Sequence, residues 1–123
     1  MTAIPVALYY GLARKHEFTM MQVGWGHNTG DTIVIMREAL RSDSINNYGK
    51  WSSPEFDALL DRADREMDPA ARNALLAKAS RLAADDVARI VTHYQINMWA
   101  AKKNLAIVPR MDEHTLAMSV TPK

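Results

Sequence analysis

The sequence S-P-E-F-D-A-L-L at residues 53–60, followed by D-R-A-D-R-E-M-D-P-A-A-R-N-A-L-L-A-K-A at residues 61–79, decides the fold. Ser53 precedes Pro54 in this stretch, and Asp68 precedes Pro69. A side chain that can cap, followed by proline at the first helical position, marks the start of a helix. The stretch therefore predicts two successive helices, with the first ending and the second beginning at Asp68 and Pro69.

Apolar residues recur at the helical period in both predicted helices, and we expect them to be buried. They are Phe56, Leu59, Leu60, Ala63 and Met67 in the first helix, and Leu75, Leu76, Ala79, Leu82 and Ala83 in the second. Asp57 with Asp61, and Arg62 with Glu66, lie one turn apart on exposed faces. The first pair is expected to repel and the second to attract only weakly, so neither is expected to decide the fold.

Outside the helix pair, apolar runs predict strands. Residues 18–25 form a compact apolar run that ends at glycines and is typical of a buried strand. Apolar and polar residues alternate through residues 90–98, which predicts another strand. Met98 and Trp99 are adjacent and so point to opposite faces of that strand. At least one of these two apolar side chains must therefore be covered by other residues. Short strands are predicted at residues 105–108, ended by Pro109, and around residues 116–120.

One further helix is predicted from Thr32 to Leu40, with Asp31 as its cap and Ile33 and Met36 on its apolar face. Together the elements predict an α/β or α+β domain, in which the helix pair packs on a small mixed sheet. We expect residues 1–123 to form a single domain, because this length suits one domain with a modest core.

Composition excludes several classes of protein. Hydrophobic residues make up 48% of the chain and the formal net charge is +1, so neither disorder nor a nucleic-acid partner is expected. The chain has no cysteine, which excludes a disulfide framework and a thiolate site. No apolar run has the length of a membrane span. The apolar stretch at residues 1–13 lacks a basic start and is interpreted as folded structure rather than a signal peptide.

No residue pattern indicates catalysis, a metal or a cofactor. The four histidines lack metal-ligand spacing; they are His16, His27, His93 and His114. No serine lies in a G-x-S-x-G turn. We therefore expect no enzyme activity, no catalytic residue, no metal site and no cofactor.

The segment G-W-G-H-N-T-G-D at residues 24–31 is the candidate site. Its three glycines allow close approach to the backbone, and it leads to a helix N-terminus, where polar or anionic groups bind. Trp25 offers a flat apolar surface with one N–H donor. The alternative is a glycine-rich turn in which Trp25 belongs to the core.

From about Phe18 to Met118 the chain resembles the C-terminal region of the extracellular solute-binding proteins of family 5, the peptide, nickel and oligosaccharide receptors of ABC importers. The motifs that carry the resemblance are S-x-E-F-D-A-L-L, D-P-x-x-R and the aromatic-rich run at residues 93–99. The resemblance implies part of a two-lobed periplasmic receptor, with residues 18–86 in the second lobe and residues 87–123 forming the return crossing and the last strands.

The resemblance also implies a binding site, partners and a location. It predicts Trp25, Asn28 and Asp31 as ligand-binding residues, although Asn28 occupies the position of the acidic residue that grips a peptide amine in the peptide-binding members. Asp31 could instead be engaged as a helix cap. The implied partners are a peptide or other small molecule and an ABC permease, and the implied location is the periplasm.

Two alternatives stay open. The first is an interaction or structural module, or a decayed receptor fragment, that self-associates through apolar surfaces which missing parts of a receptor would otherwise cover. The second, less favoured, is a small metal-dependent or hydrolytic enzyme.

Overall fold

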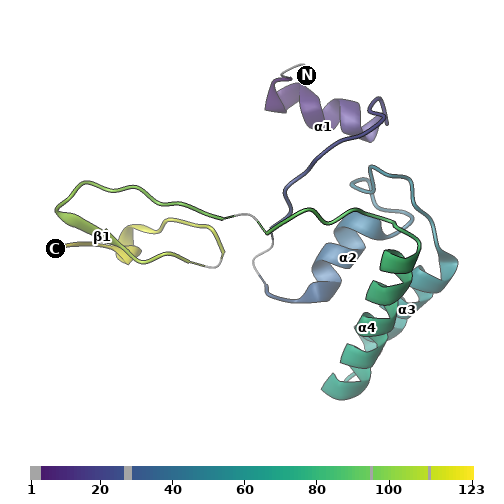
Figure 1. The fold of residues 1–123 in the computed structure, drawn as a ribbon. Coiled ribbons are helices and arrows are strands. Elements are labelled where there is room, and N and C mark those ends of the chain that lie inside the picture. Colours follow the sequence, from purple (N-terminus) through teal and green to yellow (C-terminus); the bar gives the residue numbers. More distant parts are fainter. Residues whose placement is uncertain (1–3, 27–28, 95, 111) are drawn as a thin grey trace.

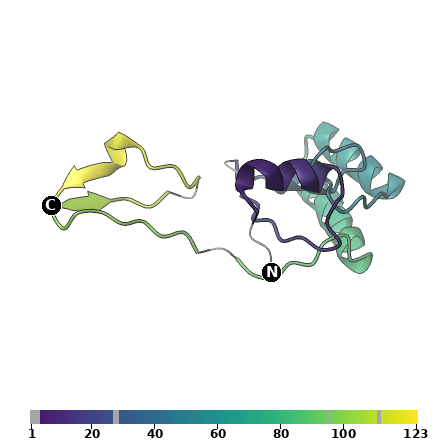
Figure 2. The ribbon, with the colours of Figure 1, turned by 90° about the horizontal axis from the view of Figure 1, so that it is seen from above.

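The computed structural model describes residues 4–26, 29–94, 96–110 and 112–123. Its elements in chain order are α1 (Val6–Arg14), α2 (Thr32–Leu40), α3 (Pro54–Arg65), α4 (Pro69–Asp85), β1 (Leu105–Ile107), a short 3-10 helix (Ala117–Ser119) and β2 (Val120–Pro122). Helices α2, α3 and α4 form one cluster, and the two strands lie apart from it at the C-terminal end (Figures 1 and 2). The predicted fold class, a mixed domain of helices and a small sheet, is confirmed.

The helix starts follow the predicted caps. The Ser53 side chain accepts a hydrogen bond from the Phe56 N–H at 3.3 Å, and the Asp68 carboxylate accepts one from the Ala71 N–H at 2.8 Å. Each bond satisfies a backbone donor that the first turn of a helix otherwise leaves unpaired. The prolines that follow the caps occupy positions where no N–H is needed.

The core lies between α2, α3 and α4. Phe56 and Leu60 are its largest fully buried side chains, and Ala63 and Ala79 are also 0% exposed. Alanine at these positions lets α3 and α4 approach closely. The remaining members of the core are Ile33, Met36, Leu59, Leu76 and Ala83, with Trp51 packed edge-on against Phe56.

Met67 is the one predicted apolar-face residue that the structure places outside the core. Its side chain is 90% exposed. Helix α3 ends at Arg65 and Glu66 is already extended, so Met67 no longer follows the helical period. Leu75 and Leu82 are half-buried and pack against the rim of the core.

The acidic side chains of α3 form more hydrogen bonds and ion pairs than the sequence predicted. Asp57 accepts a hydrogen bond from the Ser42 N–H at 3.2 Å, Asp61 accepts one from Arg41 Nη1 at 2.6 Å, and Asp64 pairs with Arg37. The Arg41 hydrogen bond lowers the pKa of Asp61, and the same bond raises the pKa of Arg41. The expected repulsion between Asp57 and Asp61 is thus offset by partners from α2 and the residues after it.

The C-terminal sheet is smaller than predicted and antiparallel rather than mixed. Strands β1 and β2 pair in the register Leu105↔Pro122, Ala106↔Thr121 and Ile107↔Val120. The predicted strand at residues 105–108 is confirmed over Leu105–Ile107. The strand predicted around residues 116–120 begins only at Val120, because Ala117–Ser119 form a 3-10 helix.

Two predicted strands are absent from the described residues. Residues 18–26, and residues 90–100 apart from residue 95, are assigned to no strand, and Met20 and Met98 are 87% and 90% exposed. A strand needs a neighbouring backbone to satisfy its N–H and C=O groups. The described chain forms only the β1–β2 sheet, so these runs find no partner. The helix pair accordingly packs on α2 and not on a sheet.

Candidate functional site

Trp25 lies in the extended segment that leads to α2. Its ring is held by Arg89. The Arg89 guanidinium lies over the indole ring, with its carbon 5.3 Å from the ring centroid. Arg89 Nη2 also donates a hydrogen bond to the Ala39 carbonyl oxygen at 3.2 Å, in the last turn of α2. A cation is favourable both above an indole face and at a helix C-terminus. Arg89 therefore joins the Trp25 segment to the helical core.

Burial lowers the pKa of Arg89, and the nearby Tyr48 opposes that shift. The salt bridges of the described residues include none with Arg89. The Arg89 charge is stabilised by the face of the Trp25 ring and by the dipole of the Ala39 carbonyl group, and not by a carboxylate. Trp25 remains half-buried.

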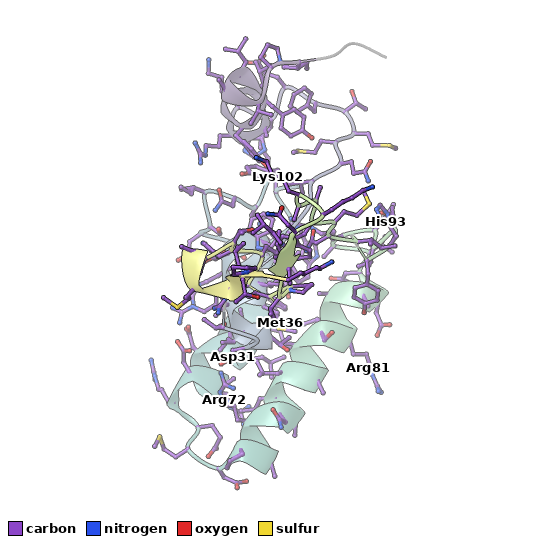
Figure 3. The ribbon with its side chains drawn as sticks, turned by 90° about the vertical axis from the view of Figure 1, so that its left-hand side faces the viewer. Asp31, Met36, Arg72, Arg81, His93 and Lys102 are labelled. Atoms are coloured by element: carbon purple, nitrogen blue, oxygen red, sulfur yellow. The ribbon has the colours of Figure 1, made fainter. Side chains whose placement is uncertain are left out.

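Asp31 is held in a different way from Trp25. Its side chain caps α2 by accepting a hydrogen bond from the Ile33 N–H at 3.2 Å, and Arg72 Nη2 of α4 lies 2.8 Å from its second carboxylate oxygen. The Asp31 N–H donates to the Thr29 hydroxyl at 3.2 Å. Figure 3 shows Asp31 and Arg72 next to each other between the two helices. The carboxylate is thus already used in holding the structure together.

The predicted site residues are distributed as follows. Trp25 is anchored by Arg89 and Asp31 by Arg72, so the two belong to different clusters of contacts. Asn28 lies outside the described residues. Sequence reasoning missed both arginines. The sequence did contain a motif that includes Arg72, because this residue ends D-P-x-x-R, four residues after the Asp68 cap. Nothing in the sequence near Arg89 marks that residue as a partner of Trp25.

Between residues 4 and 123, leaving out 27–28, 95 and 111, no three His, Asp or Glu side chains are grouped so that they could hold a metal ion. None of the helices described has the length and apolar character needed to cross a membrane.

Comparison with known proteins gives one informative relative. Over 87 residues, or 71% of this chain, the sequence is 30% identical to the protein named "Probable deoxycholate-binding periplasmic protein YgiS" of Escherichia coli (strain K12). The chain spans only 16% of that relative's length. By its name, that relative is a periplasmic protein that binds deoxycholate.

The other two comparisons found nothing. No protein-family model matches the chain, and no solved structure matches it. The first result contradicts the assignment to the family-5 solute-binding proteins. Two of the three motifs behind that assignment are helix caps followed by apolar faces, a combination that many unrelated helix pairs share. What stands in its place is the partial similarity to the deoxycholate-binding protein.

Proposed function

We propose that this chain contributes to the binding of a small-molecule solute outside the cytoplasm, for delivery to an ABC-type import permease, without catalysing a reaction. The similarity to a deoxycholate-binding periplasmic protein over 87 residues carries the proposal. Because the chain spans 16% of that relative's length, the permease and the import step are inferred for the system in which the chain acts.

The contacts of the loop before α2 favour a small amphipathic carboxylate over a peptide. Recognition of a peptide amine needs a carboxylate that is available to it, and the Asp31 carboxylate is held by Arg72 and the Ile33 N–H. Trp25 is half-buried and places a flat ring beside the Arg89 cation. Deoxycholate combines a rigid apolar ring system with a carboxylate, and both groups suit this pair.

Calorimetric titration of the 123-residue chain with submicellar deoxycholate tests the proposal. We expect saturable binding that Trp25→Ala weakens by about ten-fold, the order of loss expected when a bound molecule loses one aromatic contact. Trp99→Ala is the matched control, because the indole N–H of Trp99 bonds to Thr115 near the sheet and that variant should bind normally. The absence of saturable heat with the wild-type chain, or an equal loss in both variants, would contradict the proposal.

A second role, self-association, is favoured by the extended segment after α4. Its apolar side chains are almost fully exposed: Ile90, Val91, Tyr94, Ile96 and Met98, at 74%, 81%, 95%, 83% and 90%. We propose that a second copy of the chain covers this surface, since contiguous exposed apolar residues mark contact sites. Sedimentation velocity should show a dimer at high concentration that Ile96→Asn with Met98→Asn dissociates. A wild-type chain that stays monomeric would rule this out.

The division of the chain into residues 18–86 and residues 87–123 stays a prediction. The helical cluster and the two-stranded sheet fall on either side of it (Figure 1).

A further inference from the structure

A hollow of about 350 Å³ opens between the end of α1 and the loop that follows α2. Arg14 and His16 line one wall, and the other is lined by the polar residues Ser42, Ser44, Asn47 and Lys50 together with the apolar Ile45. None of the described residues that line the hollow carries a carboxylate. The charged groups of the hollow are therefore basic, and the hollow does not include the Trp25 and Asp31 contacts described above.

The two walls are held together at Tyr48. The His16 ring Nδ1 lies 3.0 Å from the Tyr48 carbonyl oxygen, and the rings of Tyr10 and Tyr48 are 6.3 Å apart. A carbonyl oxygen only accepts hydrogen bonds, so Nδ1 of His16 carries the hydrogen in this contact. These contacts position the end of α1 against the loop.

The loop wall is itself well braced. Asn47 is 6% exposed, and its amide group donates to the carbonyl oxygens of Arg41 at 3.3 Å and Trp51 at 2.6 Å. Three successive turns, in which Ser44, Asn47 and Lys50 donate backbone hydrogen bonds, complete it. A ligand would thus meet groups that are already positioned, which lowers the cost of ordering them on binding.

The cations of the hollow lack counter-charges. Arg14 and Lys50 are exposed and take part in no ion pair with any residue in the described part of the chain. The nearby carboxylate of Asp43 is engaged by Arg41 at 2.9 Å. The last carbonyl groups of α1 accept hydrogen bonds from the backbone that follows, so they present less negative charge to the hollow.

Ser42 adds a hydroxyl group to the lining of the hollow. Its hydroxyl oxygen accepts hydrogen bonds from the Ser53 N–H at 3.3 Å and from the Ser52 hydroxyl at 3.1 Å. A hydroxyl group has one hydrogen to donate in addition to its acceptor sites. Either hydroxyl of the Ser42–Ser52 pair can be the donor, so when Ser52 donates to Ser42 the Ser42 hydroxyl can give its hydrogen to a group in the hollow.

Lys50 occupies a position whose backbone favours glycine. Its φ is 54°, in the left-handed region that side chains with a Cβ adopt only at a cost. The chain thus places a lysine at the rim of the hollow where glycine would be easier, and strain of this kind is a reason to look for function.

We propose that this hollow binds an oxyanion group of a small solute, a carboxylate, sulfate or phosphate. Arg14 supplies a planar fork of N–H donors, Lys50 a point charge and Ser42 a neutral hydroxyl. Oxyanions bind well where charged and neutral donors converge in this way. The site is separate from Trp25, so it does not depend on the role proposed for that residue.

The test is an amide NMR titration of the 123-residue chain with sodium sulfate, sodium phosphate and sodium acetate, each at constant ionic strength set by sodium chloride. We expect saturating shifts around Ser42 and Lys50, and the anion that saturates at the lowest concentration identifies the preferred chemistry. Arg14→Gln and Lys50→Gly should each weaken binding by about ten-fold, since each removes a charge-assisted contact. Lys50→Gly is informative because glycine suits the local φ, so the loop keeps its fold.

Lys15→Gln is the control, because Lys15 is an exposed cation next to Arg14 that does not line the hollow. Its affinity should stay within about two-fold of the wild type, as removal of a charge outside the site predicts. Equal affinities in Lys50→Gly and the wild type, or shifts that do not saturate for any of the three anions, would overturn the proposal.

Discussion

Arg72 in α4 pairs with Asp31 at the start of α2, with Nη2 of the arginine 2.8 Å from a carboxylate oxygen. The same carboxylate caps α2 through the Ile33 N–H. One side chain thus starts a helix and also joins it to α4, across 41 residues of sequence. This pairing gives Asp31 a structural explanation that does not require a ligand, and it separates Asp31 from Trp25.

Replacing Asp31 should therefore destabilise the helical cluster. Asp31→Ala removes both the cap and the ion pair and should lower the free energy of unfolding by about 1–2 kcal/mol, of which the cap contributes most. Asp31→Asn keeps a good capping side chain and loses only the charge, so its cost should be smaller. Urea unfolding followed by circular dichroism measures both. Equal stability of Asp31→Ala and the wild type would contradict the capping role.

Truncating Phe56 should be the most damaging single change in the core. Phe56 is 0% exposed and touches Trp51 edge-on, so Phe56→Ala should cost about 3–5 kcal/mol of unfolding free energy. Met67→Ala is the matched control, because Met67 is 90% exposed and its truncation should change stability by less than about 0.5 kcal/mol. Comparable losses in both variants would show that Met67 is packed, contrary to the structure.

The Asp112 carboxyl should titrate well below its usual range. Hydrogen bonds from Arg110 lower the pKa of Asp112 from 3.8 to about 2, and the His114 N–H adds to the effect. A carboxyl whose pKa is lowered by folding stabilises the fold above its unfolded pKa, and that contribution is lost as the pH falls from about 4 through about 2. Carbon-detected NMR of the side-chain carboxyl measures the titration. Arg110→Ala should raise the midpoint, and an unchanged midpoint would show that Arg110 does not act on Asp112.

Removing Arg89 should release the Trp25 ring. Arg89→Ala takes away the cation over the indole and the hydrogen bond to Ala39, and the contact over the ring contributes about 0.5–1 kcal/mol. We expect the indole N–H resonance of Trp25 to move toward that of an exposed tryptophan, while the resonance of Trp51, packed on Phe56, stays in place. Arg89→Lys should keep part of the effect, because lysine retains the charge but lacks the planar group.

The helix starts and the main core could be predicted because the interactions that decide them are local. Ser53 and Asp68 cap helices that begin at the next residue, and these bonds span three residues of sequence. The burial of Phe56, Leu60, Ala63 and Ala79 likewise follows from a period that the sequence displays directly. Asp31 is the corresponding success near the site, since its capping role was predictable from its position before α2.

The contacts that hold the candidate site join residues far apart in the chain, so the sequence did not reveal them. Arg89 meets Trp25, and Arg72 meets Asp31, only after the chain has folded. The acidic residues of α3 were expected to repel weakly on an exposed face, yet Arg37 and Arg41 from the α2 region reach them. The basic hollow also needs two separate segments, the end of α1 and the loop after α2.

The sequence by itself determined where three helices begin and which of their faces are apolar, since caps and helical periodicity act over one or two turns. Tertiary structure alone decided whether the apolar runs at residues 18–25 and 90–98 became strands. A strand requires backbone partners from elsewhere, and the described chain supplies none for these runs. Contacts between residues far apart in the chain also decided the roles of Asp31 and Trp25. Asp31 joins α2 to α4 through Arg72, and Trp25 lies under the guanidinium of Arg89.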